Sequence, residues 1–483
     1  MSVHAAGGTY YVSPSGSDSN SGSLSRPFKT IQHCASVATA GATCNIEAGT
    51  YHETVTPANS GTSTSSITFK PYNGASVTVD GADAVSGWTV SSFNSSVYQA
   101  SVTLNTSLFA NQVFANGQML NEARWPAAGT DQLRPTRLTA GPNTSKTTIY
   151  DSTLTQGKDY WKGATVHYWG LDGYASKTAT VTGSNVGELF YQEPYPGNCP
   201  GLCAQFGSPY YLSGVLNALT APGEWFYDSS AHILYVWMPN SQQPPAGSVE
   251  AKQRTSAFDL SGRSYITING LSIQASTITT NSSSSHDTIT AITANYVSHF
   301  TTIVKPDSSV IVDDNTDYAF LAAHELDTGI ILNGSNNTLS NSTIAYSAGD
   351  GVSVQGTNNT VNNNVIHDVD YMAVYAAGIN LVGSGHQITN NTVYRSGRSL
   401  INWDWHVAGQ TMQNITIANN DLFNGDMLTQ DGGSIYICCQ VNLSGSTIDY
   451  NLVHDDQSVP DYSSYYTAAG IYLDNGTYNG LIH

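Results

Sequence analysis

One pattern returns five times in the C-terminal part of the chain. An apolar residue is followed three positions later by Asn or Ser and two positions after that by Ile, Val or Leu. The repeated polar residue falls at Ser342, Asn364, Asn391, Asn420 and Asn451, so successive copies lie 22, 27, 29 and 31 residues apart. Repeats of this length, with short β-branched strands and no amphipathic helical stretch, are typical of stacked β-coils. The pattern therefore predicts an all-β fold, a right-handed parallel β-helix.

The repeated Asn column is expected to be structural. Successive coils of such a fold lie about 4.8 Å apart. An Asn at the same turn of every coil can then hydrogen-bond to its copies above and below. We therefore assign these residues to the stack itself and not to chemistry.

A second repeat is the strand that follows each small-residue turn. Aligning Val352, Ile379, Ile401, Ile435 and Ile471 as inward positions puts the next residue of each strand on the outer face. That outward column reads Ser353, Asn380, Asn402, Tyr436 and Tyr472. We expect its amides and aromatic rings to bind substrate.

The repeat also divides the chain. Residues 1–98 are predicted to form an N-terminal cap, with a short helix ending near Thr39, and the first coils. Between 99 and 250 the repeat disappears and aromatic-rich segments alternate like antiparallel strands. We predict an inserted β-sandwich or barrel-like domain there. Residues 251–483 would form the main solenoid with the active-site groove.

Composition excludes several classes of partner. Lys and Arg total 16 against 35 Asp and Glu, a net charge of −19, which disfavours nucleic acid. No run of about 18 apolar residues is present, so no membrane span is expected. Only 11% of residues are charged, against about 25% in ordinary soluble domains, and Ser, Thr, Asn and Gly supply the polarity. We expect a secreted monomer.

The six cysteines fall in close pairs, as expected in an oxidising compartment. We predict disulfides between Cys34 and Cys44 and between Cys199 and Cys203. The adjacent Cys438 and Cys439 would form either a vicinal disulfide or two thiols on opposite strand faces.

Several segments resemble the secreted, pectate-lyase-like parallel β-helix enzymes that act on carbohydrates, particularly glycoside hydrolase family 141, whose members include fucosidases and xylanases. The matching segments are Tyr11-Val-Ser-Pro-Ser-Gly-Ser-Asp18, Gly49-Thr-Tyr-His-Glu53, Asn116-Gly-Gln-Met-Leu-Asn-Glu-Ala-Arg-Trp-Pro126, Ala221-Pro-Gly-Glu-Trp-Phe-Tyr-Asp228, Asp431-Gly-Gly-Ser-Ile-Tyr436 and Gly470-Ile-Tyr-Leu-Asp-Asn475. The resemblance implies a solenoid with an inserted sandwich and a carbohydrate substrate.

Residue inventory favours hydrolysis over elimination. Between Leu321 and His483 there are 14 carboxylates, two arginines and no lysine. Glycoside hydrolysis needs two well-placed carboxyl groups, whereas elimination from a uronate polymer also needs its acidic sugar neutralised. A polysaccharide lyase remains the alternative, with Arg398 or His406 as base and calcium held by acids such as Asp455 and Asp456. Hydrolysis requires no metal or other cofactor.

Two arguments select the catalytic acids. In the strand register, Asp404 and Asp474 follow equivalent strands with one coil between them, about 9.6 Å apart at the backbone. The family resemblance implies Asp431 and Asp474 instead. We take Asp431 and Asp474 as the pair, with Asp404 assisting as acid, base or water-positioning group. Gly432 and Gly433 would fold Asp431 back toward the groove, unless Asp431 only caps a turn.

The remaining candidates bind substrate. Strand alternation points Trp403 inward and Trp405 outward, where Trp405 forms a sugar platform beside His406. Arg398 would lower the pKa of a nucleophile or base, bind an anionic sugar group or form an ordinary ion pair. A noncatalytic carbohydrate-binding solenoid, which needs only a groove of aromatics and amides, is the second class of function.

Overall fold

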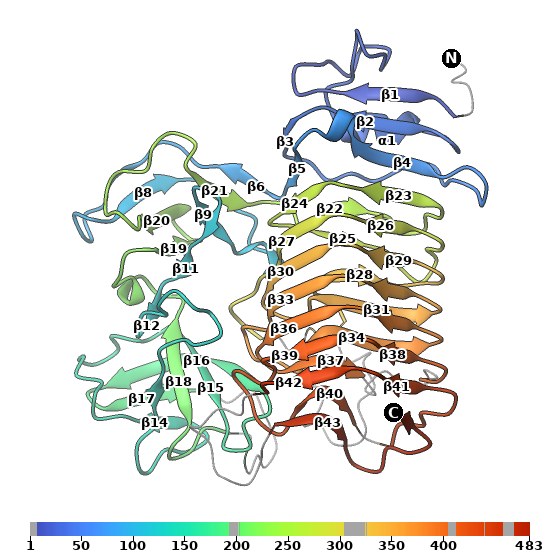
Figure 1. Ribbon diagram of the computed structural model, residues 1–483. Coiled ribbons are helices and arrows are strands. Elements are labelled where there is room, and N and C mark those ends of the chain that lie inside the picture. Colours follow the sequence, from blue (N-terminus) through green and yellow to red (C-terminus); the bar gives the residue numbers. More distant parts are fainter. Residues whose placement is uncertain are drawn as a thin grey trace.

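The computed structural model describes residues 7–192, 201, 203–303, 324, 326–403, 412–438, 440–456 and 468–483. Its main body is a stack of coils whose strands pair in parallel with those of the next coil (Figure 1). Three parallel sheets run along this stack, and a second body of antiparallel strands lies beside it. The all-β solenoid with an insertion, predicted from the repeat, is confirmed.

The first sheet contains β1 (Thr9–Val12), β2 (Thr43–Ile46), β4 (Ile67–Pro71), β23 (Ile266–Asn269), β26 (Thr288–Thr290), β29 (Thr338–Ser340), β32 (Thr360–Asn362), β35 (Gln387–Thr389), β38 (Thr416–Ala418), β41 (Thr447–Asp449) and β44 (Leu481–Ile482). The second contains β3 (Gly49–Tyr51), β5 (Val77–Asp80), β24 (Ser272–Gln274), β27 (Thr293–Ser298), β30 (Thr343–Ser347), β33 (Val365–Val369), β36 (Thr392–Ser396), β39 (Asp421–Phe423) and β42 (Leu452–His454). The third contains β22 (Ser256–Asp259), β25 (Thr277–Thr279), β28 (Ile330–Leu332), β31 (Val352–Thr357), β34 (Ala377–Ser384), β37 (Ser399–Trp403), β40 (Gly433–Ile437) and β43 (Ala469–Leu473).

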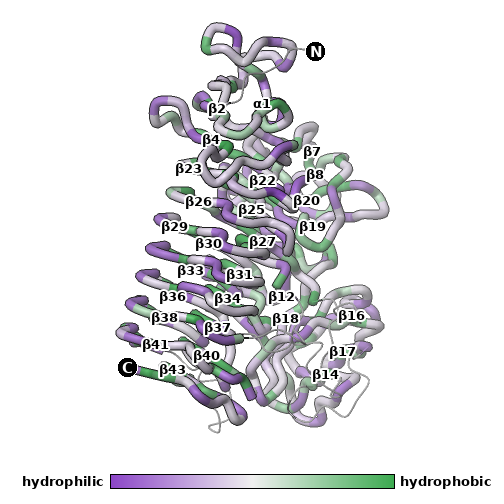
Figure 2. The backbone as a smooth tube through the Cα atoms, turned by 90° about the vertical axis from the view of Figure 1, so that its right-hand side faces the viewer, coloured by the Kyte–Doolittle hydropathy of each residue, from purple (hydrophilic) through white to green (hydrophobic). Residues whose placement is uncertain are grey.

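The strand register of the third sheet is the predicted one. Its outward column runs from Ser353 through Asn380, Asn402 and Tyr436 to Tyr472, each residue paired with the next. The alternate residues point inward and form one continuous apolar core along the stack. Hydrophilic residues gather on the turns at the solenoid edge farthest from the insertion (Figure 2).

The predicted Asn ladder is confirmed at the turn before the second sheet. The backbone N–H of each residue donates to the Asn Oδ1 of the next coil, from Ser342 to Asn451, at 2.9 to 3.0 Å. The Asn391 amide also donates to Val361 O at 3.0 Å. Each buried amide therefore satisfies backbone groups of its neighbouring coils, which would otherwise be costly to bury.

The N-terminal end of the stack carries the expected helix, α1 (Ile31–Val37). The Thr30 hydroxyl caps it by accepting from His33 N at 3.0 Å. The Cys34–Cys44 disulfide ties it to β2 with a Cα–Cα distance of 6.2 Å. No helix in the described part of the chain is long and apolar enough to cross a bilayer.

The other cysteines are only partly described. Cys203 and Cys438 are also disulfide-bonded. Cys199 and Cys439 lie outside the described residues.

The inserted body is built from three sheets with mostly antiparallel pairing. The first contains β6 (Ala82–Ala84), β9 (Val113–Ala115), β10 (Gln118–Met119) and β21 (Val249–Lys252). The second contains β7 (Thr89–Val90), β8 (Tyr98–Ser101), β11 (Asn121–Glu122), β19 (Glu224–Asp228) and β20 (Ile233–Trp237). The third contains β12 (Arg124–Trp125), β13 (Leu138–Thr139), β14 (Thr148–Tyr150), β15 (Thr165–Trp169), β16 (Ser176–Asn185), β17 (Glu188–Tyr191) and β18 (Pro209–Ser213).

The insertion begins before residue 99, where the sequence pattern placed its start. Strand β6 already pairs with β21, and β7 and β8 continue the sheet of β20. Residues 82–98 thus belong with the inserted strands and not with the first coils. Short strands of a coil and of an antiparallel sheet have the same local pattern, so only their pairing separates them.

Asp287 occupies the Asn position of a second ladder, where Asn337 and Asn359 follow in the next coils. Its Oδ1 accepts from Ile266 N at 2.8 Å, and its own N–H donates to Asn337 Oδ1 at 3.0 Å. Its Oδ2 is buried and has no hydrogen-bond partner among the described residues. Burial raises the pKa of this carboxyl to about 7.

Replacing Asn391 by Ala should destabilise the solenoid. The change leaves the buried N–H of Asn364 without its acceptor and Val361 O without its donor. The expected loss is about 2–4 kcal/mol in the free energy of unfolding. Urea denaturation at neutral pH measures it. Gln387→Ala, an exposed position of the same coil, is the control. Equal urea midpoints for the two variants would contradict a ladder that stabilises the stack.

Asp287→Asn should stabilise the protein at alkaline pH. The folded-state pKa lies above the unfolded one, so the stability from Asp287 is complete below about pH 4 and is lost as the pH rises through about 7. An Asn amide, which Asn337 uses to donate to Asn333 O, removes this loss. Unfolding at pH 8 should cost roughly 1–3 kcal/mol more than for the wild type. A lower urea midpoint of the variant at pH 8 would refute this assignment.

Candidate active site

Asp474 lies directly after β43, at the end of the outward column. Its Oδ2 accepts from the Tyr436 hydroxyl at 2.9 Å, and its Oδ1 accepts from Asn475 N at 2.7 Å. The carboxyl is half-buried and approaches the column from its C-terminal coil. The register thus places Asp474 as predicted, within contact of a second residue of the predicted site.

Asp431 lies before β40, yet its side chain reaches the same end of the outward column as Asp474 does. Its own backbone is left-handed, with φ of 57°, whereas neither following glycine has a positive φ. The expectation that Gly432 and Gly433 make the bend is therefore wrong. They are needed for space, because a Cβ at 432 would meet the Asp426 carboxyl and one at 433 would meet Ala469 O. Asp tolerates the left-handed region better than most residues do.

The two acids converge on Tyr472. Its hydroxyl interacts with both carboxyls, and its pKa is raised to about 12 by burial and by the charges of Asp431 and Asp474. The pKa of Asp431 is raised first by burial and then by the charge of Asp474, against the opposing effect of Arg398. One carboxyl with a raised pKa beside a second that accepts two hydrogen bonds is an arrangement suited to acid–base chemistry.

Arg398 is buried beneath this pair. Its guanidinium lies 4.1 Å from the ring centroid of Tyr375 and 4.6 Å from that of Tyr436. Nη1 donates to Tyr174 O at 3.0 Å and approaches Asp431 O at 3.5 Å. Burial alone lowers an arginine pKa, yet that of Arg398 is raised by the groups around it, Tyr375, Tyr436, Asp426 and Asp431. Arg398 therefore stays charged.

Two buried carboxyls lie near enough to Arg398 for its charge to act on them. Asp426 and Asp370 are both 0% exposed, and each has one oxygen without a hydrogen-bond partner in the described chain. Burial raises the pKa of Asp426 to about 7 and that of Asp370 well above its usual range, although Arg398 opposes both shifts. The site thus combines two half-buried acids with a buried cation and two buried acids.

The remaining predicted residues divide into two groups. Asn380 and Asn402 are buried and bonded to each other, Asn402 Nδ2 donating to Asn380 Oδ1 at 3.0 Å. They support the floor of the column and present no free surface to a sugar. Trp403 points inward, as predicted, and is 1% exposed. Asp404, Trp405 and His406 lie outside the described residues.

The acids proposed for calcium have other partners. Asp455 Oδ2 lies 2.8 Å from His454 Nδ1, whereas Asp456 Oδ1 accepts from the Ser434 hydroxyl and from Gly425 N. No group of three or more His, Cys, Asp or Glu side chains arranged to hold a metal ion occurs among the described residues.

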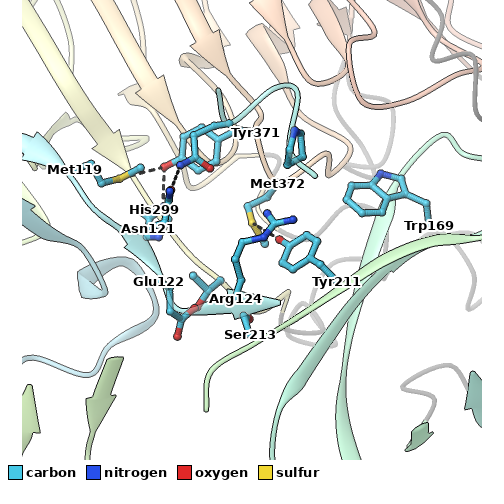
Figure 3. Close-up of a pocket in the computed structure, with 13 residues that line it drawn as sticks. Met119, Asn121, Glu122, Arg124, Trp169, Tyr211, Ser213, His299, Tyr371 and Met372 are labelled. Carbon is cyan, nitrogen blue, oxygen red and sulfur yellow. Dashed lines mark hydrogen bonds between the residues drawn. The ribbon is translucent and has the colours of Figure 1, made fainter. Parts of the chain in front are cut away.

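A hollow lies at the seam between the insertion and the solenoid (Figure 3). Neither Asp431 nor Asp474 lines it. Many of the side chains that line this hollow contact one another. The Arg124 guanidinium stacks 3.5 Å from the centroid of the Tyr211 ring, and His299 Nδ1 lies 2.7 Å from the Tyr371 hydroxyl. The first contact lies within the insertion and the second within the solenoid, whereas the Tyr211 hydroxyl donates to Met372 Sδ at 3.8 Å and so joins the two bodies. We assign the hollow to that seam.

Sequence reasoning missed Tyr375, Asp426 and Asp370 as members of the site. They sit in irregular turns outside the repeated strands, so no register places them. One sequence feature could have identified Asp426 as a member of the site. Asp426 precedes the Asp-Gly-Gly motif by five residues, and a pair of glycines next to an acid often marks a close approach.

Comparison with known proteins bears on the fold. Residues 328–483 match the family model described as the right-handed beta helix region. The solenoid is a right-handed parallel β-helix. A solved structure described as a glycoside hydrolase aligns with a TM-score of 0.66 over 98% of this chain and 96% of that one, at 15% sequence identity. At this identity the likeness shows a shared fold, insertion included, and nothing about chemistry.

Two curated proteins share local sequence with the chain. One segment of 76 residues is 45% identical to the uncharacterized protein YwoF of Bacillus subtilis, and one of 75 residues is 39% identical to pectate lyase PEL9 of Emericella nidulans. These segments span 16% and 15% of this chain, and 16% and 18% of those relatives. The likeness therefore covers less than a fifth of either protein.

Arg398→Lys should weaken the contact between insertion and solenoid. Lysine keeps the charge but loses the planar stacking on two tyrosine rings and the directed bond to Tyr174 O. We expect about 2–4 kcal/mol less stability toward urea. Arg26→Lys, an exposed arginine of the N-terminal cap, is the control and should cost under about 1 kcal/mol. Similar losses in both variants would contradict the special position of Arg398.

Proposed function

We propose that the protein is a secreted glycoside hydrolase that cleaves a plant or microbial polysaccharide or oligosaccharide, of the kind found in glycoside hydrolase family 141. The observation that carries the proposal is the convergence of Asp431 and Asp474 on the Tyr472 hydroxyl. Two carboxyl groups close to one another are the machinery that glycoside hydrolysis requires. The shared fold with a structure described as a glycoside hydrolase is in keeping with it.

The roles of the two acids follow from their surroundings. Asp431, whose pKa is raised, is the general acid that protonates the leaving glycosidic oxygen. Asp474, which accepts from Tyr436 and from Asn475 N, is the base that activates water or the nucleophile that attacks the anomeric carbon. Tyr472 lies between them and keeps both carboxyls oriented. Arg398 limits the rise in the pKa of Asp431 and so stabilises the carboxylate that forms when Asp431 gives up its proton.

A polysaccharide lyase is the second candidate, because one segment resembles pectate lyase PEL9. Elimination needs a base that accepts the proton next to the uronate carboxyl. Arg398 is unsuited to this role, since it is buried and its pKa is raised further. An acidic groove also repels a uronate polymer unless a cation intervenes. Hydrolysis therefore agrees better with the described residues.

Isosteric variants of the two acids test the proposal. Asp431→Asn and Asp474→Asn should each lower kcat roughly 1,000-fold on a glycan that the wild type cuts. Asp431→Asn should lose much less on an aryl glycoside, because a good leaving group needs little protonation. Asp228→Asn, at the half-buried end of β19 in the insertion, should change neither.

Product analysis separates the classes of function. Reducing ends without ultraviolet absorbance indicate hydrolysis, whereas an absorbing unsaturated product indicates elimination. Glycan binding by the wild type without any product supports a binding solenoid instead. Full activity in both Asn variants would leave the proposed pair without a role.

A further inference from the structure

A loop of the insertion forms one wall of the proposed catalytic site. Residues 170–175 connect β15 to β16 and lie against Gln430, the residue before Asp431. Gln430 N donates to Gly173 O at 3.1 Å, and its Nε2 donates to Leu171 O at 3.0 Å and to Asp172 O at 3.1 Å. Three hydrogen bonds to one residue hold this loop in register with the catalytic turn.

Further contacts fix the C-terminal half of the same loop. Arg398 donates to Tyr174 O, and Ser176 N donates to Ala373 O at 2.7 Å. Tyr174 and Ala175 pack into an apolar cluster with the aromatic side chains of the site, Tyr375, Tyr436 and Tyr472. The loop is therefore attached to the solenoid at Gln430, Arg398 and Ala373.

The loop brings a third carboxyl, Asp172, to the site. Its backbone N donates to Gly201 O at 3.0 Å, and its carboxyl lies against the Gly201 Cα, where any Cβ would collide with it. Gly201 has φ of 80°, which favours glycine in any case. The position of the carboxyl is thus determined by close packing, and its charge is near enough to raise the pKa of Asp431.

This carboxyl has acceptor capacity to spare. Among the described residues it forms no salt bridge and accepts no hydrogen bond, and burial raises its pKa, although it stays partly exposed. A half-buried carboxylate at a site built for glycans accepts hydrogen bonds from sugar hydroxyls, whereas a sugar carboxylate would be repelled by it. Asp172 is thus suited to bind neutral sugars through their hydroxyl groups.

We propose that Asp172 is a substrate-binding residue that the insertion supplies to the catalytic groove, where it selects neutral glycans over uronate-bearing ones. This inference rests on the proposed glycoside hydrolase function. It assigns substrate selection to the insertion and bond cleavage to the solenoid.

Steady-state kinetics of the full chain test the inference, with arabinoxylan as the neutral probe and glucuronoxylan as its uronate-bearing counterpart. Asp172→Ala should raise KM for arabinoxylan roughly 10- to 100-fold and leave kcat within about threefold. Asp172→Asn should narrow the preference for arabinoxylan over glucuronoxylan by about tenfold. Asp159→Asn, an exposed carboxylate of the same insertion, should behave as wild type.

A pH profile provides a readout that a merely structural loop would not change. Arg398, Asp474, Tyr472 and Asp426 also face Asp431, and they remain in the variant. Removing the charge of Asp172 lowers the pKa of Asp431, so the alkaline limb of kcat/KM should move to lower pH in Asp172→Asn.

The outcomes distinguish failure of the proposed hydrolase function from failure of the inference about Asp172. A wild type that neither binds nor cuts either xylan, nor any other neutral or uronate glycan in the same assays, overturns the function and the inference together. A wild type that cuts, with KM, substrate preference and pH profile unchanged in both Asp172 variants, overturns the inference alone.

Discussion

Parallel hydrogen bonding between successive coils is the constraint on which the rest of the molecule depends. Each coil is too short to bury its own apolar face, so it is stable only when the next coil repeats its register. The buried Asn ladder enforces that register, because each amide satisfies backbone groups of neighbouring coils. A slip of one residue would turn every inward side chain outward. The outward column that ends at Tyr472 is a direct product of this register.

The register brings charged side chains of the candidate site close enough together to influence one another's charge. Asp431 and Asp474 approach Tyr472 from opposite ends of neighbouring third-sheet strands, and the buried Arg398 lies below them. Burial makes Asp370, Asp426 and Asp431 costly to ionise, and a single buried cation offsets part of that cost for all three. One arginine thus opposes the rise in pKa of the half-buried Asp431 and of the buried Asp370 and Asp426.

The insertion completes the groove. A solenoid face is a flat, repetitive surface, which suits a long polymer but offers little to distinguish one sugar from another. The loop between β15 and β16 adds a wall that hydrogen-bonds to Gln430 and Arg398 and carries Asp172. In this chain the repeated strands place the two acids, and the loop of the insertion shapes the surface that a sugar beside them would contact.

The sequence by itself determined the coil period, the Asn ladder, the inward and outward positions and the location of Asp474, because each follows from strand alternation and a repeated spacing. Tertiary structure alone decided the start of the insertion, the left-handed backbone of Asp431 and the burial of Asn380 and Asn402. It also decided which groups surround Arg398, because Tyr375, Asp370 and Asp426 come from irregular turns that no repeat places. Periodicity specifies a residue within its coil, whereas contacts between turns and an inserted body depend on packing that no local pattern encodes.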